Sequence, residues 1–213
     1  MLTVNEIFHS VQGESTYAGR PCVFVRLTAC DLRCSWCDTP YAFHEGRKMA
    51  LDEVLDAVEA YGCPLVEVTG GEPLLQREVY PLMQALLDRG KTVLVETGGH
   101  RSIAGIPDGV VIVMDVKCPG SGEAEQTCWE NLGRLPASAE VKFVIKDRAD
   151  YEYARDVLAM HALDRRAAAV HFSPVHGTLD PRRLSEWVLA DRLPVRVQLQ
   201  LHKYIWSPET RGV

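Results

Sequence analysis

The stretch Cys30-Asp-Leu-Arg-Cys34-Ser-Trp-Cys37-Asp-Thr-Pro40 places three thiols within eight residues, directly after an apolar segment. Thiolates are soft metal ligands, and three of them spaced C-x3-C-x2-C indicate a metal site. The spacing offers three ligands and no obvious fourth one. A four-iron cluster held here would therefore keep one iron open to a ligand from outside the protein.

Two other interpretations of these thiols remain open at this point. The set could bind structural zinc with His44 or Cys63 as the fourth ligand, or Cys34 and Cys37 could form a redox dithiol. A zinc ribbon normally has a second C-x2-C at some distance, and the chain has none. A dithiol would not need Cys30. The spacing therefore favours the iron–sulfur cluster.

The cysteines followed by Gly70-Gly71-Glu72-Pro73 make a pattern that resembles the radical SAM enzymes. Further motifs extend the resemblance over almost the full length, toward the branch of that family that forms 7-deazapurines. These motifs are Val11-Gln12-Gly13-Glu14, Arg26, Trp36-Cys37-Asp38-Thr39, Thr69-Gly70-Gly71-Glu72-Pro73, Glu96-Thr97-Gly98, Asp115-Val116-Lys117-Cys118-Pro119 and Gln200-Leu201-His202.

The resemblance implies a lyase-type reaction in the biosynthesis of queuosine and other 7-deazapurines. Such an enzyme converts 6-carboxy-5,6,7,8-tetrahydropterin to 7-carboxy-7-deazaguanine with loss of ammonia. It uses a [4Fe-4S] cluster, S-adenosyl-L-methionine (SAM) and Mg²⁺. SAM binds the open iron, and its cleavage gives a 5′-deoxyadenosyl radical that abstracts hydrogen from the substrate. The protein's part is to position the reacting atoms and to exclude water.

The resemblance also assigns roles to individual residues. The cluster ligands are Cys30, Cys34 and Cys37. The residues expected at SAM are Trp36, Cys37, Asp38, Gly71, Glu72, Asp115, Val116 and Lys117. Those expected at the substrate are Val11, Gln12, Gly13, Glu14, Arg26, Thr69 and His202, and the hydroxyl of Thr39 is expected at Mg²⁺. Two stretches depart from the family's pattern, namely Asp115, where some relatives carry serine, and the segment from Glu96 to His100.

Length and composition limit the remaining possibilities. With 213 residues, 46% of them hydrophobic, we expect one domain over residues 1–213. Its core covers about 20–204, between a short N-terminal substrate-contacting segment and a C-terminal tail. A net charge of −6 argues against nucleic-acid binding. The chain shows no signal peptide and no stretch of membrane-spanning length, and its seven cysteines suit a reducing compartment, so we expect a cytoplasmic protein.

The periodicity predicts an α/β fold in which strands and helices alternate. We expect strands at 22–28, 65–69, 92–97, 110–116, 140–146, 169–174 and 195–202. Helices are expected at 51–61, in a segment that ends at Gly90, at 150–162, and at 181–190 with Asp180 as N-cap. In 23–28 and 195–202 one face is apolar and the other polar, which favours a partial (β/α) barrel over a doubly wound sheet.

Several candidate motifs lie at the carboxyl ends of predicted strands, where barrel enzymes carry their catalytic residues, namely 30–37, 69–73, 96–99, 115–119, 173–177 and His202. The alternation directs inward the side chains of Glu67, Thr69, Glu96, Asp115, Lys117, Lys142 and Lys146. Arg26 is also expected inside the barrel, where its partner is either Glu67 or Glu96, or the substrate.

The partners and the chain end complete the expectations. We expect a small pterin substrate, a flavodoxin-like one-electron donor and a homodimer. A glycyl-radical activase is the alternative enzyme, and it would need a protein-docking surface rather than a polar lumen. His100, His171 and His176 are interpreted as solvent or loop histidines, and residues 206–213 as a frayed tail.

Overall fold

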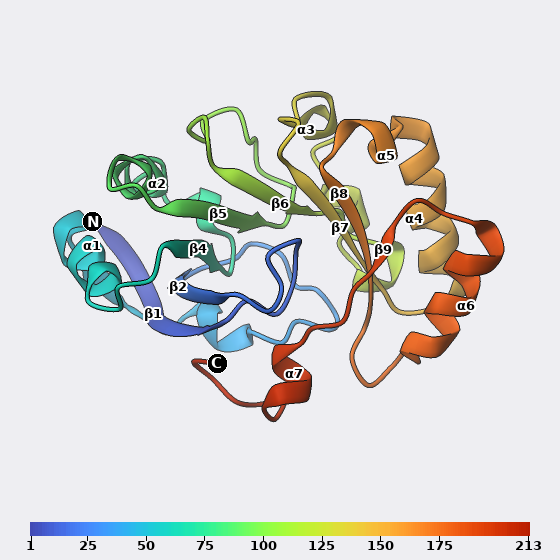
Figure 1. Ribbon diagram of the computed structural model, residues 1–213, viewed down its shortest axis with the longest axis horizontal. Helices are drawn as coiled ribbons and strands as arrows, with labels where there is room; N and C mark the ends of the chain where they lie inside the picture. The colour runs from blue at the N-terminus through green and yellow to red at the C-terminus, as the bar shows by residue number, and fades with distance from the viewer.

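The computed structural model describes residues 1–213 and is built around one nine-stranded sheet (Figure 1). The strand order is β3-β1-β2-β4-β5-β6-β7-β8-β9. The strands are β1 (Leu2–Val11), β2 (Pro21–Leu27), β3 (Arg47–Met49), β4 (Leu65–Gly70), β5 (Thr92–Thr97), β6 (Val111–Asp115), β7 (Glu140–Ile145), β8 (Ala169–Pro174) and β9 (Arg196–Val197). β2 and β4 to β9 run parallel, whereas β1 and β3 are antiparallel additions at one edge.

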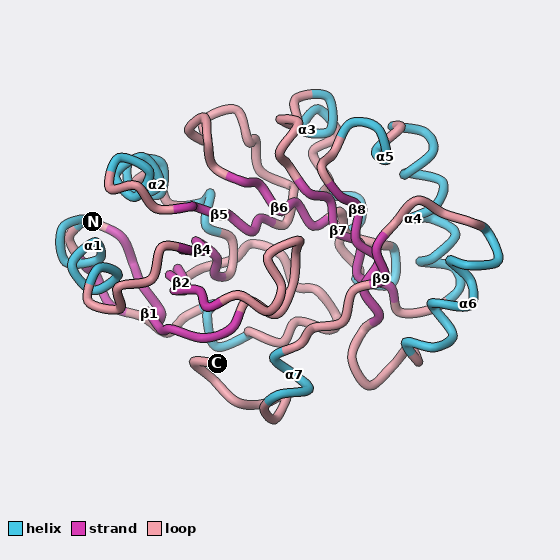
Figure 2. The backbone as a smooth tube through the Cα atoms, viewed as in Figure 1, coloured by secondary structure: helices cyan, strands magenta, loops and turns pink.

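Helices cover the outer face of this curved sheet, with α1 and α2 beside the early strands and α4 to α6 beside the late ones (Figures 1 and 2). The helices are α1 (Leu51–Glu59), α2 (Val79–Asp88), α3 (Glu130–Gly133), α4 (Arg148–His161), α5 (Leu163–Arg166), α6 (Pro181–Asp191) and α7 (His202–Ile205). No helix has both the length and the apolar character needed to cross a membrane. The predicted partial barrel is confirmed.

The alternation of side chains explains why the sheet has an apolar outside and a polar inside. In β4, Val66 and Val68 belong to the hydrophobic core under the helices, whereas Glu67 and Thr69 line a cavity inside the sheet. β7 repeats this pattern, because Phe143 belongs to the core and its neighbour Lys142 lines the cavity. The local signals also hold, because the Asp180 side chain accepts a hydrogen bond from the Arg182 N–H at 2.9 Å and caps α6.

The two ends of the chain differ from the sequence prediction. β1 was not predicted as a strand, because its pairing with β2 depends on contacts that a local pattern does not reveal. The predicted strand at 195–202 is wrong in most of its length: β9 ends at Val197, and the chain then turns inward so that Leu201 N–H bonds to the Gly13 carbonyl.

The tail at 206–213 is not frayed, which corrects the sequence interpretation. The guanidinium of Arg211 lies 3.7 Å from the ring centroid of Tyr41 and pairs with Glu45 at 2.9 Å. These contacts return the tail to the mouth of the barrel, and Val213 lines the same cavity as Glu67.

Candidate active site

The interior of the partial barrel holds a cavity of about 610 Å³, a volume usual for small-molecule sites. It brings together nearly all of the residues that the sequence motifs single out. Those that line it are Val11, Gln12, Gly13, Glu14, Arg26, Cys30, Cys34, Trp36, Cys37, Asp38, Thr39, Thr69, Gly71, Glu72, Asp115, Lys117 and His202. Among the residues assigned a role at a ligand, Val116 is the exception: its side chain is fully buried in the core, and its N–H bonds to the Lys142 carbonyl, so a ligand could meet only its backbone.

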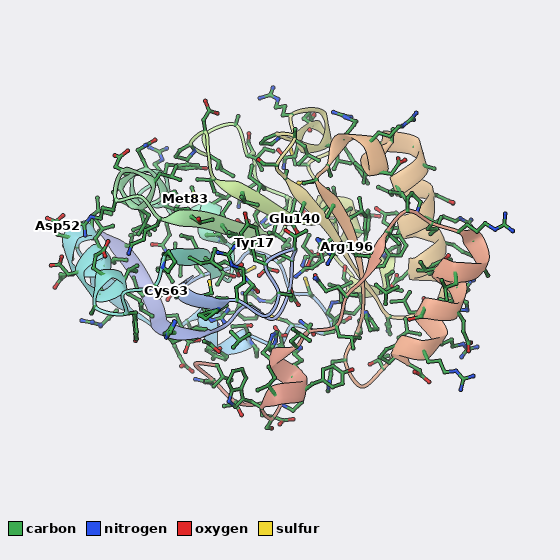
Figure 3. The ribbon with its side chains drawn as sticks, viewed as in Figure 1. Tyr17, Asp52, Cys63, Met83, Glu140 and Arg196 are labelled. Atoms are coloured by element: carbon green, nitrogen blue, oxygen red, sulfur yellow. The ribbon has the colours of Figure 1, made fainter.

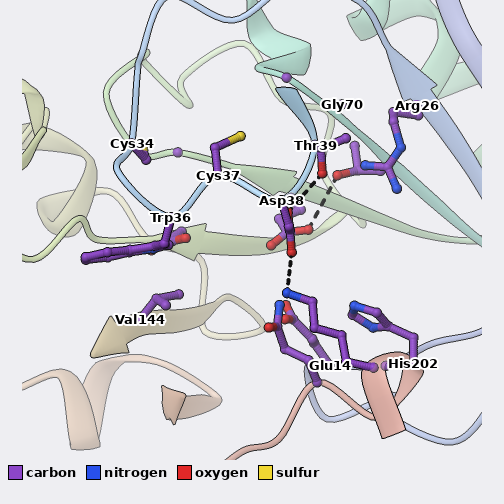
Figure 4. A pocket seen from close by; sticks show the side chains of 18 of the residues that line it. Glu14, Arg26, Cys34, Trp36, Cys37, Asp38, Thr39, Gly70, Val144 and His202 are labelled. Atoms are coloured by element: carbon purple, nitrogen blue, oxygen red, sulfur yellow. Dashed lines mark hydrogen bonds and ion pairs between the residues drawn. The ribbon is translucent and has the colours of Figure 1, made fainter. Parts of the chain in front are cut away.

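The cysteine loop forms one wall of the cavity, with Cys34, Cys37 and Trp36 close together (Figure 4). A neighbouring segment holds this loop in place. Ser35 N–H bonds to the Ser121 carbonyl at 3.0 Å, and the Ser35 hydroxyl bonds to the Gly120 carbonyl at 2.9 Å. The aperiodic stretch at 118–137, for which the sequence suggests no role, therefore supports the cysteine loop.

The donor set of this loop fits an iron–sulfur cluster better than structural zinc. All three cysteines are free thiols on one cavity, and burial raises the pKa of each, so protons must leave when they ligate a metal. No three His, Cys, Asp or Glu side chains are placed to bind a single ion. Of the candidate fourth zinc ligands, His44 is exposed outside the cavity. Cys63 precedes β4, at the end of that strand away from the cysteine loop (Figure 3).

The Gly70-Gly71-Glu72-Pro73 turn packs directly against the cysteine loop. A Cβ on Gly71 would lie 2.3 Å from the Ala29 carbonyl oxygen and 2.8 Å from the Cys30 Cβ, so only glycine fits there. The Glu72 carboxyl is buried and accepts hydrogen bonds from the Leu74 N–H, the Gly98 N–H and the Thr97 hydroxyl. Its side chain is thus an anchor to the end of β5, and the backbone of the turn faces the cavity.

Asp115 and Lys117 lie where β6 ends and pair at 2.7 Å. Burial would lower the pKa of Lys117, but the carboxylate of Asp115 outweighs it and raises that pKa above the ordinary value. The second carboxylate oxygen, Oδ1 of Asp115, is buried without a hydrogen-bond partner. A buried acceptor on a cavity wall is available to a bound ligand.

Next to Asp115 on the inner face of the sheet, the cavity is lined by a buried lysine between two carboxylates. Lys142 of β7 pairs with Glu14 at 2.6 Å and also with Glu96 of β5. Burial would lower the pKa of Lys142, but Glu14 and Glu96 raise it well above the ordinary value. For Glu14, burial would raise the pKa, and the ammonium of Lys142 lowers it instead. The sequence analysis predicted that Lys142 and Glu96 face inward, but it gave Lys142 no role and considered Glu96 only as a partner of Arg26.

Arg26 lies on the cavity, as its strand register predicts, but its partner is neither Glu67 nor Glu96. Its Nε donates to Glu6 Oε1 at 2.8 Å, and the Tyr41 hydroxyl donates to the same oxygen at 3.0 Å. Glu6 is opposite Arg26 in the β1–β2 pairing, so it could be found only once β1 is recognised as a strand. Arg26 makes no other hydrogen bond within the protein, which leaves its terminal N–H groups for a ligand.

The N-terminal and C-terminal segments meet over the cavity (Figure 4). A Cβ on Gly13 would lie 2.1 Å from Nδ1 of His202, so the imidazole of α7 rests on the glycine backbone. Burial lowers the pKa of His202. Asp38 beside the cysteines pairs with Lys203 of α7 at 2.6 Å and accepts a hydrogen bond from the Thr39 hydroxyl at 2.9 Å.

Two expectations for individual residues are wrong. Lys146 is exposed, because β7 ends at Ile145 and the chain leaves the barrel there. His171 is not a solvent or loop histidine: it is fully buried on β8, and its Nε2 lies 2.6 Å from Oε2 of Glu140. Glu140 also accepts a hydrogen bond from the Thr16 N–H at 2.9 Å, beside the loop that carries Tyr17 (Figure 3). These residues fill the barrel below the cavity.

The fold and the cysteine site define the class of protein. Residues 25–109 match the Radical SAM superfamily, so this is a radical SAM enzyme. The whole chain is 50% identical to the 7-carboxy-7-deazaguanine synthase of Koribacter versatilis, with both chains fully covered. It is 47% identical to the enzyme of the same name from Chlorobaculum tepidum, over all of this chain and 97% of that one. The chain belongs to the 7-carboxy-7-deazaguanine synthase family.

Solved structures agree with this fold. QueE from Escherichia coli superposes with a TM-score of 0.75 at 23% identity, and 93% of each chain is covered. SuiB from Streptococcus suis, in a structure bound to S-adenosylmethionine, gives a TM-score of 0.58 at 15% identity over 81% of this chain and 48% of that one. These likenesses show a shared fold.

Proposed function

We propose that this enzyme converts 6-carboxy-5,6,7,8-tetrahydropterin to 7-carboxy-7-deazaguanine with loss of ammonia. The observation that carries the proposal is the single cavity in which the three cysteines form one wall and a buried charged cluster forms the other. A reaction between SAM and a small polar ring requires the cofactor groups and the polar substrate-binding groups to lie on one cavity. The names of the full-length relatives support the same reaction.

The residues divide between the two walls. Cys30, Cys34 and Cys37 would hold a [4Fe-4S] cluster, and Trp36, Asp38, Gly71, Glu72, Asp115, Lys117 and the backbone of Val116 would contact SAM. Val11, Gln12, Gly13, Glu14, Arg26, Thr69 and His202 would contact the pterin. Cluster and SAM, when bound, supply the one-electron chemistry that removes a hydrogen atom from the substrate.

The protein's own contribution is to hold and orient. The planar guanidinium of Arg26 suits the substrate carboxylate, since Glu6 engages only its Nε. The tail and α7 close the mouth of the barrel through the Asp38–Lys203 pair and the contacts of Arg211. Closing the mouth keeps water away from a reactive intermediate.

The remaining components are further proposals. The hydroxyl of Thr39, which lines the cavity, would be a ligand to Mg²⁺, an ion that takes few protein ligands and keeps oxygens of water or substrate. An external donor of flavodoxin type would supply the electron, and the whole chain would act as one domain in a homodimer. The seven free thiols suit the reducing cytoplasm.

The test is an anaerobic assay with reconstituted enzyme, SAM, dithionite and 6-carboxy-5,6,7,8-tetrahydropterin. We expect 7-carboxy-7-deazaguanine and ammonia, which together account for every atom of the pterin. Cys34→Ala should lose the iron–sulfur absorbance and SAM cleavage together, whereas Cys128→Ala, a thiol outside the cavity, should lose neither. Cleavage of SAM without any conversion of the pterin would contradict the proposed function.

A further inference from the structure

A third carboxyl group lies beside the Lys142 cluster and has a different environment from the other two. Glu67 of β4 lines the cavity, and only 5% of the residue is exposed. Lys142 pairs with Glu14 and Glu96 but makes no hydrogen bond or ion pair with Glu67. Of the three neighbouring carboxyl groups, Glu67 is thus the one that does not bind the ammonium.

The neighbour of Glu67 fixes which of its oxygens is free. The backbone N–H of Glu14 donates to Gln12 Oε1 at 3.0 Å, and a backbone N–H can only donate. The Gln12 amide is therefore oriented with its Nε2 toward Glu67, where it donates to Oε2. Oε1 of Glu67 makes no hydrogen bond within the protein, so a proton on this carboxyl belongs on Oε1.

The charges around Glu67 favour that proton. Burial raises the pKa of Glu67 well above its ordinary value, and the nearby carboxylates of Glu96 and Glu14 raise it further. Lys142 on β7 opposes them only in part. On β2 the register partner of Glu67 is Phe24, and the nearby titratable group is the buried thiol of Cys22, whose pKa burial raises.

We propose that Glu67 is a further substrate-contacting residue, which meets the pterin as a neutral carboxylic acid and donates a hydrogen bond from Oε1 to an acceptor atom of its ring. Lys142 is a positioning residue. Its ammonium donates to Glu14 and Glu96 and holds both as hydrogen-bond acceptors, which leaves the donor role to Glu67. The pocket then offers the pterin both acceptors and a donor. This inference rests on the proposed function, since it names a contact to that substrate.

The experiment compares Glu67→Gln with Glu67→Leu in the reconstituted holoenzyme. A glutamine amide keeps an acceptor for Gln12 and a neutral donor for the ligand, whereas leucine keeps neither. We expect Glu67→Gln to retain kcat/KM for the pterin within about threefold, and Glu67→Leu to lose at least about tenfold, the loss of one hydrogen bond. Both variants should keep SAM binding, measured by equilibrium dialysis, because the cysteine wall is untouched.

The pH profile separates a donor from a purely structural carboxyl. In the parent enzyme, kcat/KM for the pterin should fall as pH rises and Glu67 loses its proton, and Glu67→Gln should lack that limb. Equal losses in the two variants, or an unchanged alkaline limb in Glu67→Gln, would overturn the inference. If the parent fails to convert the pterin at all, it is the proposed function that fails instead.

Discussion

Replacing Lys142 by methionine tests the electrostatics of the substrate wall. The change keeps a long apolar stem and removes the ammonium that pairs with Glu14 at 2.6 Å and with Glu96. Breaking a buried ion pair on one side costs about 3–5 kcal/mol, because an uncompensated charge remains inside. The Glu96 side chain is 28% exposed, so we expect the lower end, about 3 kcal/mol of unfolding free energy.

The loss should depend on pH with a definite sign. Glu14 has a lowered pKa in the fold, so its contribution is present above the ordinary glutamate pKa of 4.5 and is lost as pH falls through the lowered value. Lys142 has a raised pKa, so its contribution is present below 10.5 and is lost as pH rises through the raised value. Without the ammonium, burial raises the pKa of Glu14, which can then take up a proton in mild acid. The unfolding free energy that Lys142→Met loses should therefore be largest at about pH 8 and smaller at about pH 5.

The assay is urea unfolding of the anaerobic protein, followed by circular dichroism at both pH values. A loss of about 3 kcal/mol corresponds to a fall in melting temperature of about 6–12 °C for a chain of this length. The matched control is Lys146→Met, an exposed lysine just past the same strand, which should change stability by about 0.5 kcal/mol or less. Adding Glu14→Gln and Glu96→Gln to the Lys142 variant should restore most of the loss. A Lys142 variant as stable as the Lys146 control, or a penalty that is equal at both pH values, would refute the reasoning.

Three further predictions concern the ligand contacts. Thr39→Ala should weaken the Mg²⁺ dependence of turnover more than Thr39→Ser, which keeps the hydroxyl, and equal effects in a Mg²⁺ titration would indicate packing instead. Arg26→Lys should keep an ion pair to Glu6 and the cluster absorbance but lose at least about tenfold in kcat/KM, about 1.4 kcal/mol, because the fork is gone; unchanged kinetics would show that the arginine does not contact substrate. Gly13→Ala should displace the imidazole of His202 and raise the pterin KM about tenfold or more while SAM binding persists, and a normal KM would argue against that contact.

The parallel part of the barrel was predictable because its signals are local. Alternating strands such as 65–69 and the cap at Asp180 depend on neighbours within a few residues, and the structure reproduces both. The shared position of the motifs at carboxyl strand ends also follows from parallel topology alone. This shared position was enough to predict that the cysteines and the acidic residues of the strands line one cavity.

What the sequence did not predict depends on pairing across the fold. Glu6 contacts Arg26 only through the antiparallel register of β1 with β2, and the tail is held by contacts between Arg211 and two residues far back in the chain. The inward position of Lys142 was predictable, because its side chain alternates along the strand with those of apolar neighbours. Its partners Glu14 and Glu96 lie 128 and 46 residues away, and no local pattern joins them.

The two walls of the cavity are held by different parts of the chain, and this makes their functions separable. The cysteine loop depends on the turn at Gly120 and Ser121, which binds Ser35 through two hydrogen bonds. The substrate wall depends on the inner faces of β4, β5 and β7, whose outer faces are packed in the core. A change at Glu67 therefore alters the hydrogen-bonding groups of one wall without moving the loop that holds the other. Loss of pterin binding with SAM binding intact is the result that such an arrangement requires, and it is also the result that distinguishes a failed contact from a failed fold.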